Sequence, residues 1–162
     1  MSGVRFSHRP PMEKIRAKFT VGVFGIIFDE QNRILLCHRT DYDLWNLPGG
    51  GLEEREPPWE GIKREVKEET GFDVEVIKIL GVYSKRDEDN LAFSFLCKII
   101  GGQAVLNNEA DQIKYFDIDE LPKNTIPKQV ERIKDALQNS DRTILKVQVG
   151  RNSLELAKEG KL

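Results

Sequence analysis

The chain has 162 residues, of which 39% are hydrophobic and 32% are charged, and its formal net charge at pH 7 is −2. This composition is typical of one globular domain with a proper core, and it argues against a disordered chain. No apolar run approaches the roughly 20 residues of a membrane helix, and no global positive field is present to attract nucleic acid. We therefore expect neither a membrane nor a nucleic acid as a partner.

The N-terminal segment, residues 1–17, is basic but lacks the apolar stretch of a signal peptide, and we expect it to form an arm or extension. The next segment, TVGVFGIIFD (20–29), is rich in β-branched and aromatic residues, which predicts a strand. After the turn DEQN, the segment RILLCHR (33–39) predicts the returning strand of a hairpin. Residues 40–51 contain Pro48 and three glycines and predict a loop.

The pattern becomes helical from Pro57 onward. Trp59, Ile62 and Val66 stand at i, i+3 and i+7, so they predict one apolar stripe on a helix. Gly71 follows Thr70 and is expected to cap the C-terminus of this helix.

The second half of the chain predicts more strands and one further helix. Strands are expected at 73–84, 91–100, 113–118 and 142–149, and a helix at 127–138 with Val130, Ile133 and Leu137 on one face. A polar tail follows. The order of elements predicts an α+β domain in which strands form hairpins around one central helix, rather than a regular βαβ alternation.

The two cysteines, Cys37 and Cys97, each lie inside an apolar run, ILLCHR and FSFLCKII. Unpaired cysteine is among the most buried residue types, so we expect two buried free thiols rather than a disulfide or a zinc site. Free thiols favour a cytoplasmic location.

The helix that starts at Pro57 carries an unusual density of acid near its C-terminal end. Glu65, Glu68 and Glu69 are neighbours on the helix surface, where like charges repel and the helix dipole disfavours anions. Such breaches of local rules are expected at functional sites, and a hard divalent cation such as Mg²⁺ or Mn²⁺ would reverse both penalties. The alternative is a solvated acidic face that is offset by Lys63 and Lys67.

The spacing of these residues decides between the two alternatives. It resembles the Nudix box, G-x5-E-x7-R-E-U-x-E-E-x-G-U, in which U is a bulky apolar residue. Every fixed position is filled, by Gly50, Glu56, Arg64, Glu65, Val66, Glu68, Glu69, Gly71 and Phe72. The segments LWNLPGG and IKYFDIDELP are similar to the family's lead-in and closing strand. The resemblance implies a Nudix fold, with mixed β-sheets between helices and a loop-helix-loop motif, over residues 18–140.

The resemblance to the Nudix hydrolases also implies a reaction. Members cleave a nucleoside diphosphate linked to another group, X, by attack of water on phosphorus with Mg²⁺ or sometimes Mn²⁺. It implies that Glu65, Glu68 and Glu69 bind or position the metal and that the Gly49 carbonyl adds a ligand. It further implies that Arg64 pairs with Glu56 and holds the loop against the helix.

Some site residues outside the helix are less well determined by the resemblance. The family often supplies a further carboxylate before its last strand, and Glu109 matches that position, with Asp111 as the fallback. The general base is then either Glu65 or Glu109.

Three residues near the box are candidates for substrate binding. Arg39 and the backbone of Gly50 are candidates for contacts with phosphate, with a surface role as the alternative for Arg39. Trp45 is a candidate for stacking on a base, and core packing is its alternative. Arg55 stands where the family commonly has Gly, which favours a left-handed turn, so we expect either a slightly different loop or a strained, left-handed Arg55.

The substrate class stays open between nucleoside triphosphates, ADP-ribose and nucleotide sugars. The rival hypotheses are a non-catalytic Nudix module that senses a nucleotide or binds a partner, and an acidic structural domain without metal. Residues 141–162 are expected to add a strand and a polar tail to the same domain, and a homodimer is expected from the family's habit.

Overall fold

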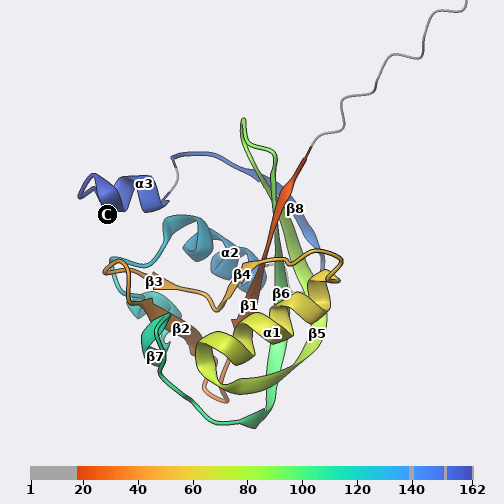
Figure 1. Cartoon of the computed structure of the whole chain (residues 1–162), viewed down its shortest axis with the longest axis vertical. Coiled ribbons are helices and arrows are strands. Elements are labelled where there is room, and N and C mark those ends of the chain that lie inside the picture. Colours follow the sequence, from red (N-terminus) through yellow and green to blue (C-terminus); the bar gives the residue numbers. More distant parts are fainter. Residues whose placement is uncertain (1–17, 139–140, 152, 162) are drawn as a thin grey trace, which may run out of the picture.

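The computed structural model describes residues 18–161, except residues 139, 140 and 152, and it contains two β-sheets and three α-helices within that part of the chain (Figure 1). The larger sheet has the strand order β4-β1-β6-β5-β8, and the smaller sheet has the order β3-β2-β7. The strands are β1 (Thr20–Ile27), β2 (Ile34–Arg39), β3 (Trp45–Asn46), β4 (Gly49–Gly51), β5 (Phe72–Lys85), β6 (Asn90–Gly102), β7 (Ala110–Phe116) and β8 (Ile144–Gln148). The helices are α1 (Pro58–Thr70), α2 (Pro127–Gln138), α3 (Ser153–Lys158) and the short 3-10 helix η1 (Ile118–Glu120). The predicted α+β class is confirmed.

The larger sheet is covered on both faces, and the alternation of side chains along β1 explains how. Val23 and Ile27 belong to a core cluster that includes Ile62 and Val66 of α1. Ile26 belongs to a second cluster, which includes residues of α2 and of the smaller sheet. Since successive strand residues point to opposite faces, α1 covers one face of β1 and α2 covers the other.

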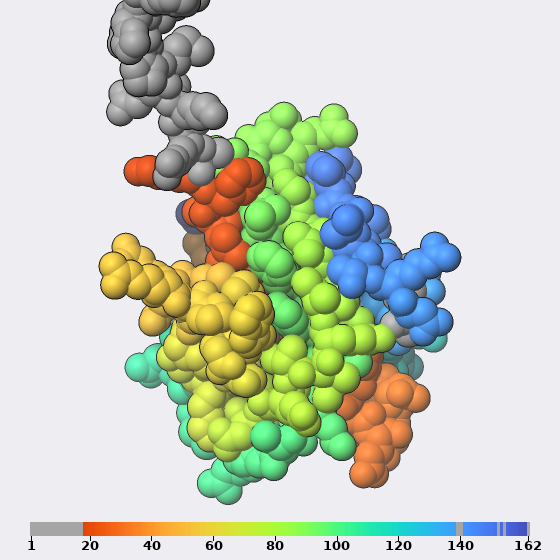
Figure 2. Space-filling model, turned by 90° about the vertical axis from the view of Figure 1, so that its right-hand side faces the viewer, coloured from red at the N-terminus to blue at the C-terminus, as the bar shows by residue number. Residues whose placement is uncertain are grey.

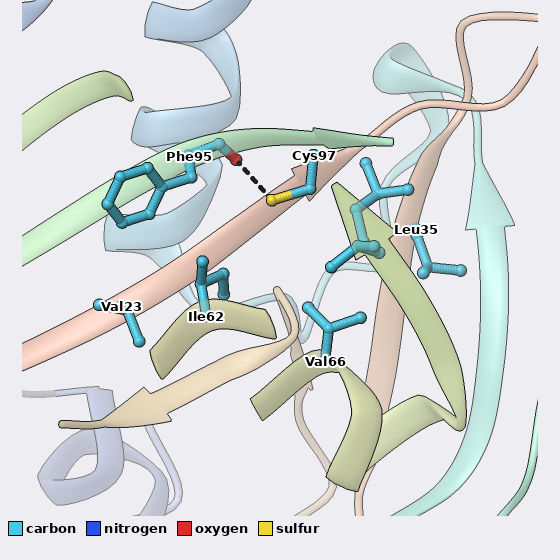
Figure 3. Packing of buried hydrophobic residues seen from close by; sticks show 8 residues of the cluster. Val23, Leu35, Ile62, Val66, Phe95 and Cys97 are labelled. Atoms are coloured by element: carbon cyan, nitrogen blue, oxygen red, sulfur yellow. Dashed lines mark hydrogen bonds between the residues drawn. The ribbon is translucent and has the colours of Figure 1, made fainter. Parts of the chain in front are cut away.

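Figure 3 shows the α1 side of this core, where Ile62 and Val66 face Val23, Phe95 and Cys97. Ile62 and Val66 are fully buried, as the helical stripe predicted. The third member of the stripe, Trp59, is 54% exposed, so its predicted burial is wrong. Trp59 is the second residue of α1, in its first turn.

The predicted hairpin of residues 20–29 and 33–39 is also wrong in its pairing. The turn forms, with an isolated antiparallel bridge between Phe28 and Ile34, but the strands then separate into different sheets. β1 pairs in parallel with β6 and antiparallel with β4, whereas β2 pairs with β3 and β7. Because both edges of β1 are occupied, β2 has no place beside it.

The C-terminal part adds an edge to the larger sheet. β8 pairs in parallel with β5, with Val82 opposite Leu145, and Figure 2 shows the two strands side by side. The predicted loop at 40–51 contains the short strands β3 and β4. Both cysteines are free and buried, as predicted. Among the described helices, none has the length and apolar character needed to cross a membrane.

Candidate active site

The site is built where the glycine strand β4 meets helix α1. β4 pairs with β1 and leads through a short loop to α1, which begins at Pro58. The helix ends at Gly71, which has φ 79° and donates its backbone N–H to the carbonyl of Lys67, so the predicted cap is confirmed. Arg55 in the intervening loop has φ 63°, which is the left-handed conformation expected for it. The loop at Arg55 and the cap at Gly71 fix the position of the acidic face of α1 relative to β4.

Arg64 gathers the carboxylates around it. Its Nε and Nη2 atoms donate to the two carboxylate oxygens of Glu56 over 2.8 and 2.9 Å, so the predicted pairing of these residues is present. Its Nη1 donates to Glu65 and Glu68, each at 2.9 Å, and Nη2 also reaches the carbonyl of Gly51 at 3.1 Å. The guanidinium lowers the pKa of Glu56 to about 2.

Glu65 and Glu69 are the carboxylates that lie deepest. Glu65 is 9% exposed, and burial raises its pKa. Glu69 accepts a hydrogen bond from the Gly49 N–H at 2.9 Å. The pKa of Glu69 is raised to about 8, first by burial and then by the neighbouring charges of Glu65 and Glu109, against the opposing effects of the Gly49 hydrogen bond and the charge of Arg39. These acids are therefore short of compensating positive charge.

A cavity of about 250 Å³ adjoins Glu69, and we call it the acid-lined cavity. Its lining includes Glu69, Glu109 and Asp41, together with Arg39 and Asn46. Arg39 forms a two-pronged ion pair with Asp41, at 2.7 and 2.6 Å. The structure thus brings Glu69, Glu109 and Arg39, all of them predicted site residues, to one cavity.

A second cavity, of about 260 Å³, lies on the other side of Arg39 and Asn46, which line both. We call it the base-lined cavity, because Lys85, Lys128 and Arg132 line it and no Asp or Glu among the described residues does. The other lining residues are Phe24, Gly49, Gly50, Ile126, Gln129 and Ser153.

Gly50 separates the carboxylates from the base-lined cavity. A Cβ atom at Gly50 would stand 2.5 Å from the Glu65 Oε2 atom, so no side chain fits between them. Gly49 lines the same cavity and is bonded to Glu69 through its N–H. A phosphate in this cavity can therefore approach the glycine backbone closely while it stays near the acids of α1.

The basic residues of α2 were not predicted as site residues. The buried face of α2 carries Lys128, Gln129 and Arg132 beside Ile133 and Ala136, whereas Leu137, predicted to be on the apolar face, is 45% exposed. A signal was present in the sequence, since Lys128 and Arg132 stand i, i+4 on the face that Ile133 places toward the core.

Two other candidates lie away from the cavities. Trp45 is 8% exposed and packs edge-on against Phe116, with ring centroids 4.8 Å apart, and it lines neither cavity. This placement favours the core-packing alternative over stacking on a substrate base. Asp111, the fallback for Glu109, is held 2.6 Å from the Nδ1 atom of His38.

The chemistry of the oxygen donors fits a hard divalent cation, although the acids are not arranged around one. Within the described ranges, no group of three or more His, Cys, Asp or Glu side chains is placed to hold a metal ion. The predicted convergence of Glu65, Glu68 and Glu69 is therefore incomplete, because Arg64 holds Glu65 and Glu68 while Glu69 turns to Gly49. Because burial raises the pKa of both Glu65 and Glu69, a bound cation would stabilise their ionised forms, and their oxygens suit Mg²⁺ or Mn²⁺.

Comparisons with known proteins agree with this geometry. A sequence model of the family described as NUDIX domain matches residues 18–137. The chain is 36% identical over 121 residues to a "MutT-like protein" of Streptomyces ambofaciens, which covers 75% of this chain and 79% of the relative. It is 36% identical over 121 residues to a "Putative 8-oxo-dGTP diphosphatase" of Bacillus subtilis, over 72% of this chain and 79% of the relative.

Two further similarities concern proteins named for another substrate. The chain is 38% identical over 110 residues to an "ADP-ribose pyrophosphatase" of Methanocaldococcus jannaschii, over 64% of each protein. The crystal structure of an ADP-ribose pyrophosphatase from Streptococcus suis superposes with a TM-score of 0.71 at 27% identity, over 79% of this chain and 99% of that one.

Proposed function

Since this chain belongs to the Nudix hydrolase family, we propose that it cleaves a pyrophosphate bond in a nucleoside diphosphate linked to another group, X. The observation that carries the proposal is the position of two box acids: Glu69 lines the acid-lined cavity, and Glu65 lies against Gly50, which lines the base-lined cavity. Hydrolysis of a diphosphate needs both kinds of surface, because its charge must be neutralised and a water must be activated.

Each residue of the proposed site has a part in this reaction. Glu65, Glu68, Glu69, Glu109 and the Gly49 carbonyl are the proposed ligands of Mg²⁺ or Mn²⁺. When bound, the ion would neutralise phosphate charge and lower the pKa of water. Arg64 holds Glu56, Glu65 and Glu68 in place.

The remaining roles concern the substrate and the proton. Arg39 stands between the two cavities, and with the Gly50 backbone it is proposed to bind phosphate oxygens. Either Glu65 or Glu109 accepts the proton of the attacking water. Glu109 is exposed and lines the acid-lined cavity, whereas Glu65 is buried next to Gly50.

The substrate is proposed at the level of a class. The similar proteins are named for ADP-ribose and for 8-oxo-dGTP, which share a nucleoside and a diphosphate but differ in the group attached to it. We therefore propose nucleoside triphosphates, ADP-ribose or nucleotide sugars as the class.

A substrate panel with Mg²⁺ or Mn²⁺ tests the proposal. The purified chain is incubated with deoxynucleoside and nucleoside triphosphates, ADP-ribose and nucleotide sugars, and released phosphate, pyrophosphate and nucleoside monophosphate are measured. We expect metal-dependent cleavage of at least one compound. Absence of cleavage in the whole panel would support the rival hypothesis of a non-catalytic nucleotide-sensing module.

A variant separates catalysis by this site from a contaminating activity. Glu69→Gln removes a proposed metal ligand and should lower kcat by about 100-fold or more while the fold persists. Glu60→Gln is the matched control, because Glu60 lies on the same helix, is exposed and, among the described residues, forms an ion pair only with Lys63. Near-equal rates of the two variants would contradict the assignment of Glu69.

Three further proposals concern the whole chain. We propose a cytoplasmic location, which the free thiols of Cys37 and Cys97 support, and a homodimer, which light scattering tests directly. We also propose that residues 18–140 form the catalytic domain and that residues 141–162 pack on it. In support, Gln148 hydrogen-bonds Arg132, and Ser153 lines the base-lined cavity.

A further inference from the structure

The base-lined cavity contains more positive charge than its surroundings neutralise. Lys85, Lys128 and Arg132 line it together with Arg39, and the lining contains no carboxylate. Arg39 is already paired with Asp41, and Lys85 lies 3.3 Å from Glu88. The two cations that reach the cavity from α2 are less compensated.

Lys128 is the first of these two. It is 9% exposed, and among the residues that the structure describes none forms a hydrogen bond or ion pair with its ammonium group. Burial lowers the pKa of Lys128, and the charge of Lys85 lowers it further. An ammonium group in such a place is costly unless an anion joins it.

Arg132 is the second. It is 3% exposed, donates from Nε and Nη2 to the Gln148 Oε1 atom at 3.1 and 2.8 Å, and lies 4.7 Å from the ring centroid of Phe24. Within the described part of the chain, no carboxylate forms an ion pair with it. Burial lowers its pKa to about 10, so the guanidinium stays charged at neutral pH.

The carboxylates on the same helix are engaged elsewhere. Lys146 pairs with Glu131 at 3.0 Å and with Asp135 at 2.8 Å. The Tyr83 hydroxyl also donates to Asp135, and the Gln148 amide donates to Glu131. Both acids are therefore turned toward β8 and β5, and the side of α2 that lines the cavity keeps its positive charge.

The position of the cavity indicates which anion it would take. Gly49 and Gly50 line one part of it, and they contact Glu69 and Glu65 respectively. A diphosphate that is cleaved at these acids would lie along the glycine strand. Lys128 and Arg132 come from α2, and so meet a group attached to that diphosphate.

We propose that Lys128, Arg132 and Lys85 form an anion subsite that binds a third phosphoryl group of the substrate, next to the diphosphate that is cleaved. The proposal rests on the proposed function and narrows its substrate class to nucleoside triphosphates. A neutral sugar, as in ADP-ribose, would leave two buried cations without an anionic partner, whereas a phosphate accepts hydrogen bonds from both.

The subsite is tested with inorganic probes that the enzyme cannot hydrolyse, so that the nucleoside plays no part. Imidotriphosphate and imidodiphosphate are titrated into the full chain with Mg²⁺ by calorimetry. Lys128→Met should weaken binding of imidotriphosphate about tenfold or more and change that of imidodiphosphate by less than about twofold. Lys134→Met is the matched control, since Lys134 is exposed on the same helix, and it should change neither.

Lys85→Met provides a second variant away from the stacked and hydrogen-bonded Arg132, and it should shift binding in the same direction as Lys128→Met. Equal weakening of binding of both probes, no weakening of either, or failure of the wild-type chain to prefer imidotriphosphate would overturn the subsite.

The panel of substrates reports separately on the proposed function. Cleavage of ADP-ribose but of no nucleoside triphosphate would leave hydrolysis standing without the subsite. If binding of imidotriphosphate depends on Lys128 but no compound of the panel is cleaved, the subsite stands and the proposed hydrolysis does not.

Discussion

Arg64 is the residue that offsets the repulsion between the carboxylates of the acidic helix in this structure. It forms five hydrogen bonds, four to the carboxylates of Glu56, Glu65 and Glu68 and one to the Gly51 carbonyl. A guanidinium can do this because its donors lie in one rigid plane, while a lysine offers a single point of charge. The same contacts tie the glycine strand to the helix through one side chain.

Arg64→Ala is therefore expected to destabilise the fold by about 1–3 kcal/mol, since it leaves the largely buried carboxylate of Glu56 without its partner. The pKa of Glu56 is lowered, so its contribution to stability is present above its ordinary value near 4.5 and is lost as the pH falls toward about 2. The cost of the substitution should shrink over that range.

Urea unfolding at several pH values measures this cost. Lys63→Ala is the control, because Lys63 forms an exposed pair with Glu60 on the same helix, and it should cost less than about 0.5 kcal/mol. An equal cost for the two variants, or a cost for Arg64→Ala that does not depend on pH, would contradict the prediction.

The residues that sequence could identify are those whose role depends on spacing along one helix. Glu65, Glu69 and Arg64 belong to this group, because a 13-residue helix fixes their relative positions. Spacing also puts Lys128 and Arg132 on one face of a helix, but the burial of Arg132 depends on Gln148 and Phe24, which are distant in sequence. Trp45 could not be assigned either, since its burial is decided by Phe116 on another strand.

At the scale of elements, β4 matters because it is a strand almost without side chains. Its three glycines pair with β1, and Gly50 lets the carboxylate of Glu65 lie against the backbone. Gly51 faces open space, because a Cβ atom at this position would have no described atom within 4 Å. The two glycines therefore differ in what a methyl group would meet.

This difference gives a matched pair of variants. Gly50→Ala should lower kcat/KM by about tenfold or more, because the new methyl group displaces Glu65 and narrows the approach to the backbone. Gly51→Ala should stay within about twofold of the wild-type rate. The measurement is steady-state hydrolysis of whichever panel compound is cleaved, with thermal melting to confirm that both variants fold. Equal rates for both would show that contact with Glu65 at Gly50 is unimportant.

The elements themselves could be predicted better than their partners. The helices 58–70 and 127–138 follow from apolar periodicity together with Pro at their starts and, for the first, Gly71 at its end. The pairing of β1 with β6, in which Thr20 lies opposite Asn90, joins segments 70 positions apart, and no local pattern specifies it. The predicted hairpin was wrong for that reason, because it rested only on the closeness of segments 20–29 and 33–39 in the sequence.

At the scale of the whole molecule, the two sheets and α2 create neighbouring cavities of opposite character that share Arg39 and Asn46. The acid-lined cavity suits cations and the base-lined cavity suits anions. Each cavity has charges that the folded chain does not fully compensate, so binding on either side should stabilise the fold. Because a cation and a phosphate at adjoining cavities attract one another, we expect each to strengthen binding of the other.

The acidic half of this arrangement makes stability depend on pH and on metal together. The pKa of Glu69 is raised to about 8, so the folded state holds a proton that the unfolded state releases near 4.5. The part of the stability that depends on Glu69 should therefore fall as the pH rises from about 4.5 to about 8 in the metal-free chain. In Glu69→Gln this part is absent, and comparison with the wild type removes the contribution of other titrating groups.

Mg²⁺ should reverse the loss, because it binds the deprotonated carboxylates of the folded state. At a concentration 100 times its Kd, a ligand specific for the folded state adds about 2.7 kcal/mol. We expect Mg²⁺ to raise the Tm clearly at pH 8 and little at pH 5, where protons compete for the same oxygens. The increase should be smaller in Glu68→Gln and Glu69→Gln and unchanged in Glu60→Gln. A Tm increase that is equal at both pH values, or equal in all variants, would place the metal elsewhere on the molecule.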